Sequence, residues 1–191
     1  IEVTDPASVR AGFAAAAEAW GRPPDIVVNN AGVALTRAAA EVTPEEWDGV
    51  LGPNLKGAFL VGQEAARGMR AAGGGSIVNV ASILGLRVAG HVAPYAASKA
   101  GLIQLTRALA LEWARDGIRV NALAPGYVET ELNREFFASE AGRKLVGRIP
   151  QRRLGRLQDL DGPLLLLCSD ASAYMTGSVV EVDGGHLVSS L

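Results

Sequence analysis

The sequence predicts an α/β fold built on a doubly wound parallel sheet, with helices on both faces. Short, largely apolar runs such as residues 26–28 and 77–81 alternate with longer segments whose apolar residues recur at helical spacing. Runs that are apolar at consecutive positions indicate strands buried on both faces, as in parallel sheets. With 191 residues, of which 49% are hydrophobic and 20% charged, residues 1–191 are expected to form a single domain.

The composition argues against several classes of protein. Lys and Arg number 18 and Asp and Glu 20, and a net charge of −2 gives no strong field to attract nucleic acid or an anionic membrane. The single cysteine, Cys168, excludes an internal disulfide and is expected to be buried as a small apolar residue. His91 and His186 are far apart and no thiols cluster, so no metal site is predicted. No long apolar run and no secretory leader are visible, so a cytoplasmic location is expected.

The N-terminal part predicts a helix between two strands. Residues 1–4 are expected to end a strand, and Asp5 and Pro6 suit the N-cap and first turn of a helix that reaches Trp20. A short parallel strand over residues 25–28 follows, buried on both sides.

The run Asn29-Asn30-Ala31-Gly32 comes directly after that strand. Small residues and a glycine let the backbone approach a flat ligand, and the amide side chains can join neighbouring strands by hydrogen bonds. An ordinary turn explains the tetrapeptide equally well.

A long helix is expected from Thr43 to about Ala72. Thr43 to Glu46 form a capping box with proline at the first helical position. Pro53 lacks a backbone donor, so a bend is predicted just before Asn54. The bend would free carbonyl groups to hold a water beside Asn54; the competing interpretation is a helix defect with Asn54 in solvent.

The second half continues the alternation of strands and helices. A strand ends at Ser82, a helix from about Tyr95 ends near residues 116–117, and a further strand covers residues 118–123. Residues 131–158 are polar and rich in arginine, which suits either a substrate lid or a solvated surface segment. A helix over residues 160–170 and a strand over residues 177–182 complete the predicted fold.

Ser82, Tyr95 and Lys99 are the candidate catalytic side chains. Tyr95 and Lys99 are four residues apart, which places both on one face of a helix. A nearby ammonium stabilises phenolate, so Lys99 is expected to lower the pKa of Tyr95 toward the range that acid/base catalysis needs. Ser82 ends a strand, where ligands bind in open α/β sheets. A solvated helix face explains the Tyr95 and Lys99 spacing as well.

Six motifs together resemble those of the short-chain dehydrogenase/reductase family, over essentially the whole chain. They are NNAG at 29–32, NLKG at 54–57, Ser82, YAASK at 95–99, PGYVET at 125–130 and TGSVVEVDGG at 176–185. The resemblance implies a Rossmann-like oxidoreductase that moves hydride between NAD or NADP and a secondary alcohol or ketone. The choice between NAD and NADP stays open.

The resemblance also implies roles for single residues. Tyr95 resembles the general acid/base, Ser82 the residue that polarises the carbonyl, and Asn54 the asparagine whose backbone holds a water in a proton relay. Lys99 resembles the residue that lowers the phenol pKa and holds the ribose hydroxyls. The resemblance implies that Glu2 and Val3 contact the adenine, and that Asn30, Ala31 and Gly32 lie near the ribose. Tyr95 and Lys99 are further implied cofactor-binding residues. So is the turn with Pro125, Gly126, Val128 and Thr130, in which Val128 and Thr130 would bind the carboxamide. The family usually has Asp at the position of Glu2, so the chain departs from the family pattern there.

The family carries a further segment before the position of Glu2. It holds a first strand, a glycine-rich phosphate loop with its helix, and a second strand and helix, about 50–60 residues at βαβ dimensions. The sequence is therefore expected to be a fragment or the ordered part of a longer chain, in which the strand at residues 26–28 presents an unpaired apolar edge.

Several alternatives to this interpretation stay open. The same fold also suits an epimerase or dehydratase, a binding protein or an inactive fragment. A homo-oligomer, a dimer or tetramer, is expected, with apolar surface left on Leu105, Leu109 and Trp113. His91 could be a second acid or a loop residue on the pocket rim, and Tyr127 is expected to line the pocket.

Overall fold

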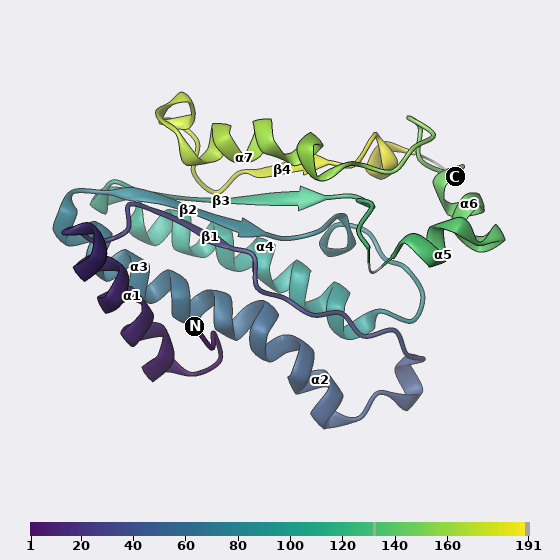
Figure 1. Cartoon of the computed structure of the whole chain (residues 1–191), viewed down its shortest axis with the longest axis horizontal. Coiled ribbons are helices and arrows are strands. Elements are labelled where there is room, and N and C mark those ends of the chain that lie inside the picture. Colours follow the sequence, from purple (N-terminus) through teal and green to yellow (C-terminus); the bar gives the residue numbers. More distant parts are fainter. Residues whose placement is uncertain (132, 190–191) are drawn as a thin grey trace.

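Four parallel strands form the sheet at the centre of the molecule (Figure 1). The computed structural model describes residues 1–131 and 133–189. The sheet order follows the chain: β1 (Ile26–Asn29), β2 (Gly75–Val80), β3 (Ile118–Pro125) and β4 (Val179–Val182). In the register of the sheet, Ile77 of β2 lies opposite Val27 of β1 and Val120 of β3.

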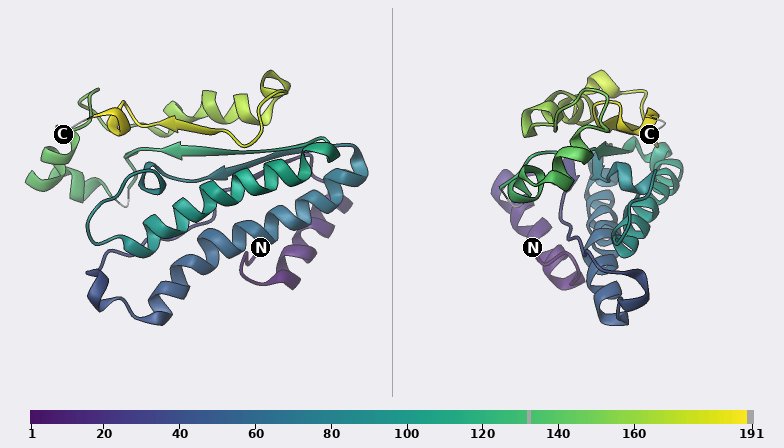
Figure 2. Two further views of the ribbon diagram at one scale, coloured as in Figure 1. Left: turned by 180° about the vertical axis from the view of Figure 1, so that it is seen from behind. Right: turned by 90° about the vertical axis from the view of Figure 1, so that its right-hand side faces the viewer.

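Helices cover both faces of this sheet. Seven α-helices occur in the described part of the chain: α1 (Pro6–Trp20), α2 (Pro44–Leu51), α3 (Ala58–Ala72), α4 (Ala93–Trp113), α5 (Arg134–Ala138), α6 (Glu140–Val146) and α7 (Asp161–Cys168). Figure 1 and the views of Figure 2 show α3 and α4 on one side of the strands and α7 on the other. This arrangement confirms the predicted doubly wound α/β fold. No helix in the described residues is long and apolar enough to cross a membrane.

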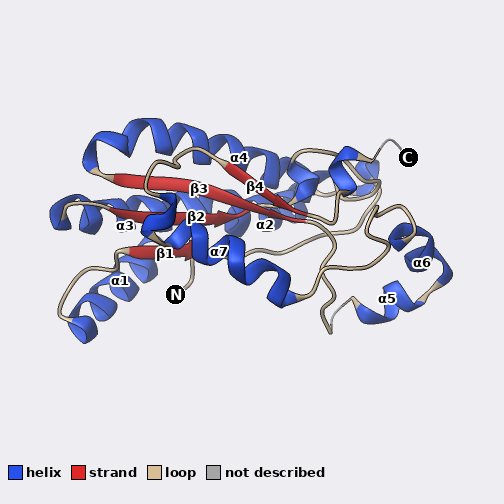
Figure 3. Cartoon of the chain, turned by 90° about the horizontal axis from the view of Figure 1, so that it is seen from above, coloured by secondary structure: helices blue, strands red, loops and turns tan. Residues whose placement is uncertain are grey.

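The carboxyl ends of the strands all point the same way. Figure 3 shows the strand arrowheads directed toward the end of the molecule where α5 and α6 lie. The predicted lid segment therefore lies beyond that edge of the sheet, where open α/β sheets bind ligands.

The predicted helix ends are confirmed at two positions. Asp5 caps α1 by accepting a hydrogen bond from the Ala7 amide at 2.9 Å. Thr43 and Glu46 form the capping box of α2, with bonds of 3.2 Å and 3.1 Å in the two directions. Both caps satisfy backbone amides that have no partner within the first turn of a helix.

A π-helical segment, Gly52–Gly57, separates α2 from α3. It lies where the bend was predicted, because Pro53 interrupts the regular hydrogen-bond pattern. Asn54 within it is 0% exposed, so the interpretation as a solvated polar residue is wrong.

The main core lies between the sheet and the helices α3 and α4. Met69, Ile77 and Val120 are fully buried there and pack with Leu109 and Trp113 of α4. The expectation that Leu109 and Trp113 leave apolar surface for an oligomer is therefore wrong. The face of α4 that carries them packs on the sheet, and burial of apolar area favours that side.

The strand β1 forms an edge of the sheet. It pairs only with β2 in the described part of the chain, and Ile26 and Val28 are 48% and 40% exposed. The predicted unpaired apolar edge is confirmed, whereas the prediction that this strand is buried on both sides is wrong. Residues 1–4 are not a strand but enter a turn closed by the Asp5 amide and the Glu2 carbonyl at 3.1 Å.

Polar side chains join the sheet to α4. Asn29 donates to Asn79 on the neighbouring strand at 2.8 Å, and Asn79 donates to Thr106 on α4 at 2.9 Å. This confirms that the Asn29 amide, on the last residue of β1, joins two neighbouring strands, and it fixes the strand ends from which the site is built.

Candidate functional site

Ser82, Tyr95 and Lys99 lie beyond the carboxyl end of β2 and on the start of α4. Ser82 follows β2 and caps a short 3₁₀ turn (Ile83–Gly85) by accepting from the Leu84 amide at 3.1 Å. Tyr95 lies in the first turn of α4 and Lys99 one turn later, with Lys99 Nζ 5.7 Å from the centroid of the Tyr95 ring. The structure therefore brings together the three side chains that were predicted to share a site.

Close backbone packing holds the turn after Ser82 against α4. A Cβ atom added to Gly85 would lie 2.7 Å from the carbonyl carbon of Lys99. Real Cβ atoms do not approach backbone so closely, so a residue without a side chain is required at this crossing.

The phenol of Tyr95 is in an environment that favours its protonated form. Burial raises the pKa of Tyr95, and a hydrogen bond with the Ser82 side chain lowers it in part. The prediction that Lys99 lowers this pKa is wrong for this arrangement. The Lys99 ammonium donates to the Val80 carbonyl at 2.7 Å, so its nearest polar partner is the end of β2 and not the phenol oxygen.

Lys99 carries an ammonium group in an almost closed environment. Its side chain is 5% exposed, and burial lowers the pKa of Lys99 to about 8. The group has three donor hydrogens, and Val80 accepts one of them. Two donors are therefore left for further acceptors near the end of β2.

Asn54 connects the loop after β1 to α4. Its side-chain oxygen accepts from the Val33 amide at 2.8 Å, and its nitrogen donates to the Val33 carbonyl and to Ser98 Oγ at 2.9 and 3.0 Å. Ser98 in turn donates to the carbonyl of Tyr95 at 2.7 Å. Ser98 was not singled out from the sequence. Its position between Tyr95 and Lys99 in the YAASK motif was the signal that could have found it.

The loop after β1 reaches the same region. A Cβ atom added to Gly32 would lie 3.2 Å from Asn54 Oδ1 and 3.5 Å from Lys99 Nζ. Asn30 and Ala31 are exposed and line an apolar groove of about 300 Å³ that follows β1. The structure thus places the predicted ribose loop beside Lys99.

The two residues predicted to meet adenine take different positions. Val3 lines the groove along β1 together with Ile26 and Val28. Glu2 is exposed, and its carboxylate accepts from the amide and the hydroxyl of Thr4 at 3.1 and 2.7 Å. These bonds lower the pKa of Glu2, and Glu2 is not among the residues that line the groove.

The turn after β3 packs against the end of β4. The Gly126 amide donates to the Val182 carbonyl at 2.9 Å, and a Cβ added to Gly126 would lie 2.7 Å from Asp183 Cα. Pro125 ends β3 opposite Val182. The Thr130 amide donates to Asn133 at 2.9 Å, so it is already engaged within its own loop.

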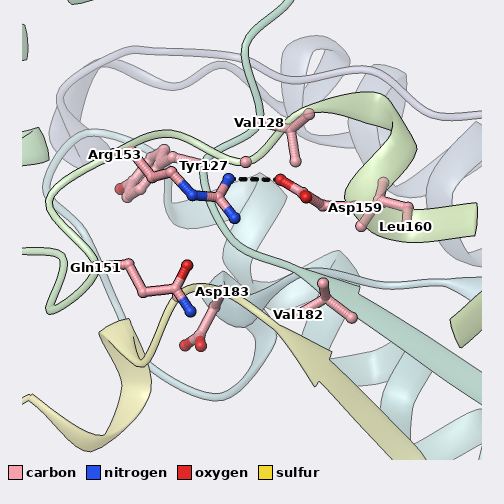
Figure 4. A pocket seen from close by; sticks show the side chains of 10 residues that line it. Tyr127, Val128, Gln151, Arg153, Asp159, Leu160, Val182 and Asp183 are labelled. Carbon is pink, nitrogen blue, oxygen red and sulfur yellow. Dashed lines mark hydrogen bonds and ion pairs between the residues drawn. The ribbon is translucent and has the colours of Figure 1, made fainter. Parts of the chain in front are cut away.

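Tyr127 and Val128 line a cavity of about 220 Å³ at this turn (Figure 4). Arg153 and Asp159 are among its lining residues and form an ion pair with an N–O distance of 2.5 Å. The dashed line in Figure 4 marks this pair. Tyr127 also lines a second cavity of about 290 Å³. The prediction that Tyr127 lines a pocket is therefore confirmed.

That second cavity adjoins the Ser82 and Tyr95 pair. Ile83 and Leu84, which follow Ser82, line it, and Tyr127 lies near enough to Tyr95 to raise the pKa of that phenol. Ser82, Tyr95 and Lys99 are not themselves among its lining residues. His91 is exposed with φ of 64° and is not among them either, although its neighbour Gly90 is.

A parallel α/β sheet with this serine, tyrosine and lysine at its carboxyl edge defines a protein of the Rossmann-like class. A family model described as Enoyl-(Acyl carrier protein) reductase matches residues 1–186. The chain belongs to the short-chain dehydrogenase/reductase family.

Relatives of the chain include sugar-acid dehydrogenases. It is 42% identical over 165 residues to 2-dehydro-3-deoxy-D-gluconate 5-dehydrogenase of Escherichia coli (strain K12), covering 85% of this chain and 65% of that protein. It is 38% identical over 189 residues to gluconate 5-dehydrogenase of Gluconobacter oxydans (strain 621H), covering 98% and 73%. A gluconate 5-dehydrogenase from Burkholderia cenocepacia J2315, solved in complex with NADP and tartrate, superposes with a TM-score of 0.94 at 37% identity, covering 99% and 74%.

Proposed function

We propose that the protein is an NAD(P)-dependent oxidoreductase that interconverts a secondary alcohol and a ketone. The observation that carries the proposal is the partly buried Tyr95 phenol, hydrogen-bonded with Ser82 and one helical turn from the buried Lys99 ammonium. We assign Tyr95 as the general acid/base, with residues 1–191 acting as one domain.

Each of the three side chains has a role in the proposed reaction. Burial keeps the Tyr95 phenol protonated, which suits donation of its proton to a carbonyl oxygen in the direction of reduction. In the direction of oxidation Tyr95 takes the alcohol proton in its phenolate form, and Lys99, whose ammonium lies 5.7 Å from the centroid of the Tyr95 ring, is assigned to hold the dinucleotide beside it. The Ser82 hydroxyl donates to the same oxygen and polarises the carbonyl.

The chain's own residues fit a nicotinamide dinucleotide. When bound, the dinucleotide accepts or supplies the hydride. Lys99 has two donors left for ribose hydroxyls, and Gly32 leaves open the space beside Lys99 and Asn54 that a Cβ atom would fill. We further assign Asn30, Ala31 and Val3 to the groove along β1, and Pro125, Gly126, Val128 and Thr130 to the nicotinamide end.

Two further assignments concern Glu2 and Asn54. Glu2 at the adenine is supported by its neighbour Val3, which lines the groove. The relay water at Asn54 is supported by the π-helical turn around that residue, which departs from regular helical hydrogen bonding.

For the substrate we propose a small polyhydroxylated acid. The gluconate and 2-dehydro-3-deoxygluconate dehydrogenases among the relatives support this class. A cytoplasmic location and a homo-oligomer stay part of the proposal, and light scattering of the purified protein tests the assembly.

A Tyr95→Phe variant tests the assignment of the acid/base. Loss of the hydroxyl removes the proton donor while the ring keeps its packing, so kcat is expected to fall about 10²- to 10⁴-fold. Formation of NAD(P)H is followed by absorbance, and dinucleotide affinity, measured by fluorescence, is expected to stay the same. Tyr174→Phe is the matched control because that tyrosine is fully exposed.

Two outcomes would redirect the proposal. Near wild-type kcat in Tyr95→Phe contradicts the acid/base role. A protein that retains dinucleotide through purification but gives no net NAD(P)H with any alcohol is an epimerase or dehydratase of the same fold.

A further inference from the structure

A positively charged cavity adjoins the candidate catalytic side chains. It has a volume of about 290 Å³ and lies between the turn after β2, the end of α6 and the 3₁₀ turn His186–Val188. Its wall includes Ile83, Leu84, Arg87, Tyr127, Arg148 and His186, and we call it the arginine cavity. No acidic side chain is among the described residues that line it.

The two guanidinium groups of the arginine cavity lack carboxylate partners among the residues that the structure describes. Arg87 is half-buried and donates to the His186 carbonyl at 2.6 Å, a neutral acceptor. Arg148 is exposed and forms neither an ion pair nor a side-chain hydrogen bond with the described part of the chain. The nearby Asp183 carboxylate is occupied by the amides of Gly185 and Leu187 at 2.8 and 2.6 Å. The positive charge is therefore left available to an anion.

His186 adds a buried polar atom without a partner. Its side chain is 5% exposed, and its Nδ1 forms no hydrogen bond in the described structure. Burial and the charges of Arg87 and Arg148 lower the pKa of His186, so its imidazole is neutral at pH 7. A buried polar atom without a partner is costly, and a neutral imidazole can hydrogen-bond to a hydroxyl or an oxyanion.

The arginine cavity is close to the reacting groups. Ile83 and Leu84 in its wall follow Ser82 directly in the chain. Tyr127 in the same wall raises the pKa of Tyr95, and burial raises the pKa of Tyr127 itself, an effect that the nearby Arg87 charge offsets in part. A small molecule with its carbonyl between Ser82 and Tyr95 can thus extend its far end toward the two arginines.

We propose that the arginine cavity binds an anionic group of the substrate and that Arg87 and Arg148 determine specificity for it. The inference rests on the proposed function, because it treats the ligand of this cavity as the far end of the reacting alcohol. A carboxylate or a phosphate provides the shared chemistry, since the guanidinium fork pairs with two oxygens of either group. The two arginines bind the anion and take no part in proton transfer.

Binding measured by calorimetry tests the proposal without relying on turnover. Gluconate and its uncharged counterpart glucitol are titrated into the protein. The wild type is expected to bind gluconate roughly tenfold or more tightly than glucitol, because hydrogen bonds to charged groups are stronger than those between neutral groups. Arg148→Met should remove that preference. The substitution deletes the charge of Arg148 but breaks no ion pair or side-chain hydrogen bond within the described part of the chain. The matched control is Arg10→Met, which removes an exposed arginine on α1, outside the cavity.

A second comparison identifies the source of the anion. Glycerol 3-phosphate and glycerol are titrated in the same way, and a preference for the phosphate that exceeds the preference for gluconate assigns the cavity to phosphorylated alcohols. Equal binding of anionic and neutral ligands, or a preference that survives in Arg148→Met, overturns the proposal.

Nuclear magnetic resonance provides a readout on the wild-type protein. The chain has two histidines, so the His186 imidazole signal can be assigned with a His91→Gln variant. The signal is expected to shift with gluconate but not with glucitol, and the absence of a shift with both gluconate and glycerol 3-phosphate contradicts a site at His186.

The outcome also separates this inference from the proposed function. Binding of gluconate that depends on Arg148, without formation of NAD(P)H, leaves the arginine cavity standing and removes the dehydrogenase. Formation of NAD(P)H at equal kcat/KM from neutral and anionic alcohols supports the dehydrogenase and contradicts the arginine cavity as an anion site.

Discussion

Replacement of the buried ammonium of Lys99 should make the protein more stable at neutral pH and inactive at the same time. Burial lowers the pKa of Lys99 from its ordinary value of 10.5 to about 8. Because one pKa step corresponds to about 1.4 kcal/mol, holding this charge in the folded protein costs on the order of 3 kcal/mol. Lys99→Met removes that cost but also the hydrogen bond to Val80, which contributes about 1 kcal/mol.

The dependence on pH has a definite sign. The unfolded chain binds the Lys99 proton more tightly than the folded protein, so the stability of the wild type relative to the variant rises between about pH 8 and pH 10.5. Below about pH 8 both states carry the proton and the full cost is present. The variant is thus expected to be more stable by about 2 kcal/mol near pH 6.5, and less stable by about 1 kcal/mol near pH 10.5.

Urea unfolding of both proteins at several pH values measures this difference. The control is Lys56→Met, which removes an exposed lysine and should show no such trend. A stability difference between wild type and Lys99→Met that is the same at about pH 6.5 and about pH 10.5 would show that the Lys99 ammonium is not desolvated, and the reasoning would be refuted.

Two further predictions concern the residues that hold the site together. Gly85→Ala should lower stability by about 1–3 kcal/mol and reduce kcat, because the new methyl group would displace the Ser82 turn from α4. Gly90→Ala, where a Cβ meets nothing within 4 Å, is its control in urea unfolding, and equal stability of the two variants would contradict the packing argument. Asn79→Ala should destabilise by about 1–3 kcal/mol, since it removes the buried link between Asn29 and Thr106. The exposed Asn30→Ala serves as the comparison in thermal unfolding, and a loss no larger than in that variant would count against the link.

The sequence predicts those parts of the fold that depend on nearby residues. The caps at Asp5 and Thr43 involve contacts within three residues, and both are found as expected. The departure from regular α-helix around Asn54 follows from Pro53, whose effect on a helix is local.

Features that depend on the whole sheet were harder to predict. The apolar residues Leu109 and Trp113 recur at helical spacing, but the spacing does not say which surface meets them, and they pack into the core. In the same way, the apolar run of β1 suggests burial on both sides, whereas its place at the edge of the sheet exposes Ile26 and Val28.

In the candidate site too, features set by nearby residues were predicted from the sequence and features set by distant residues were not. The spacing of Tyr95 and Lys99 places them on one helical face, and the structure agrees. The partner of Lys99, the Val80 carbonyl, lies 19 residues away, and Arg87 meets the His186 carbonyl 99 residues away. Contacts across such distances follow from topology, so neither the electrostatic environment of Lys99 nor the arginine cavity could be read from a local pattern.

The π-helical turn sets the number of residues that the chain needs between its second and third helices. An α-helix turns about 100° per residue, so deleting one residue from Gly52–Gly57 and restoring regular bonding would rotate α2 by about 100° relative to α3. Val50 would leave its buried position, and the Asn54 side chain would lose its hydrogen bonds to the backbone of Val33. Packing therefore constrains the number of residues in the π-helical turn as well as their types. A one-residue deletion in this turn would lower the stability of the protein more than a conservative substitution there.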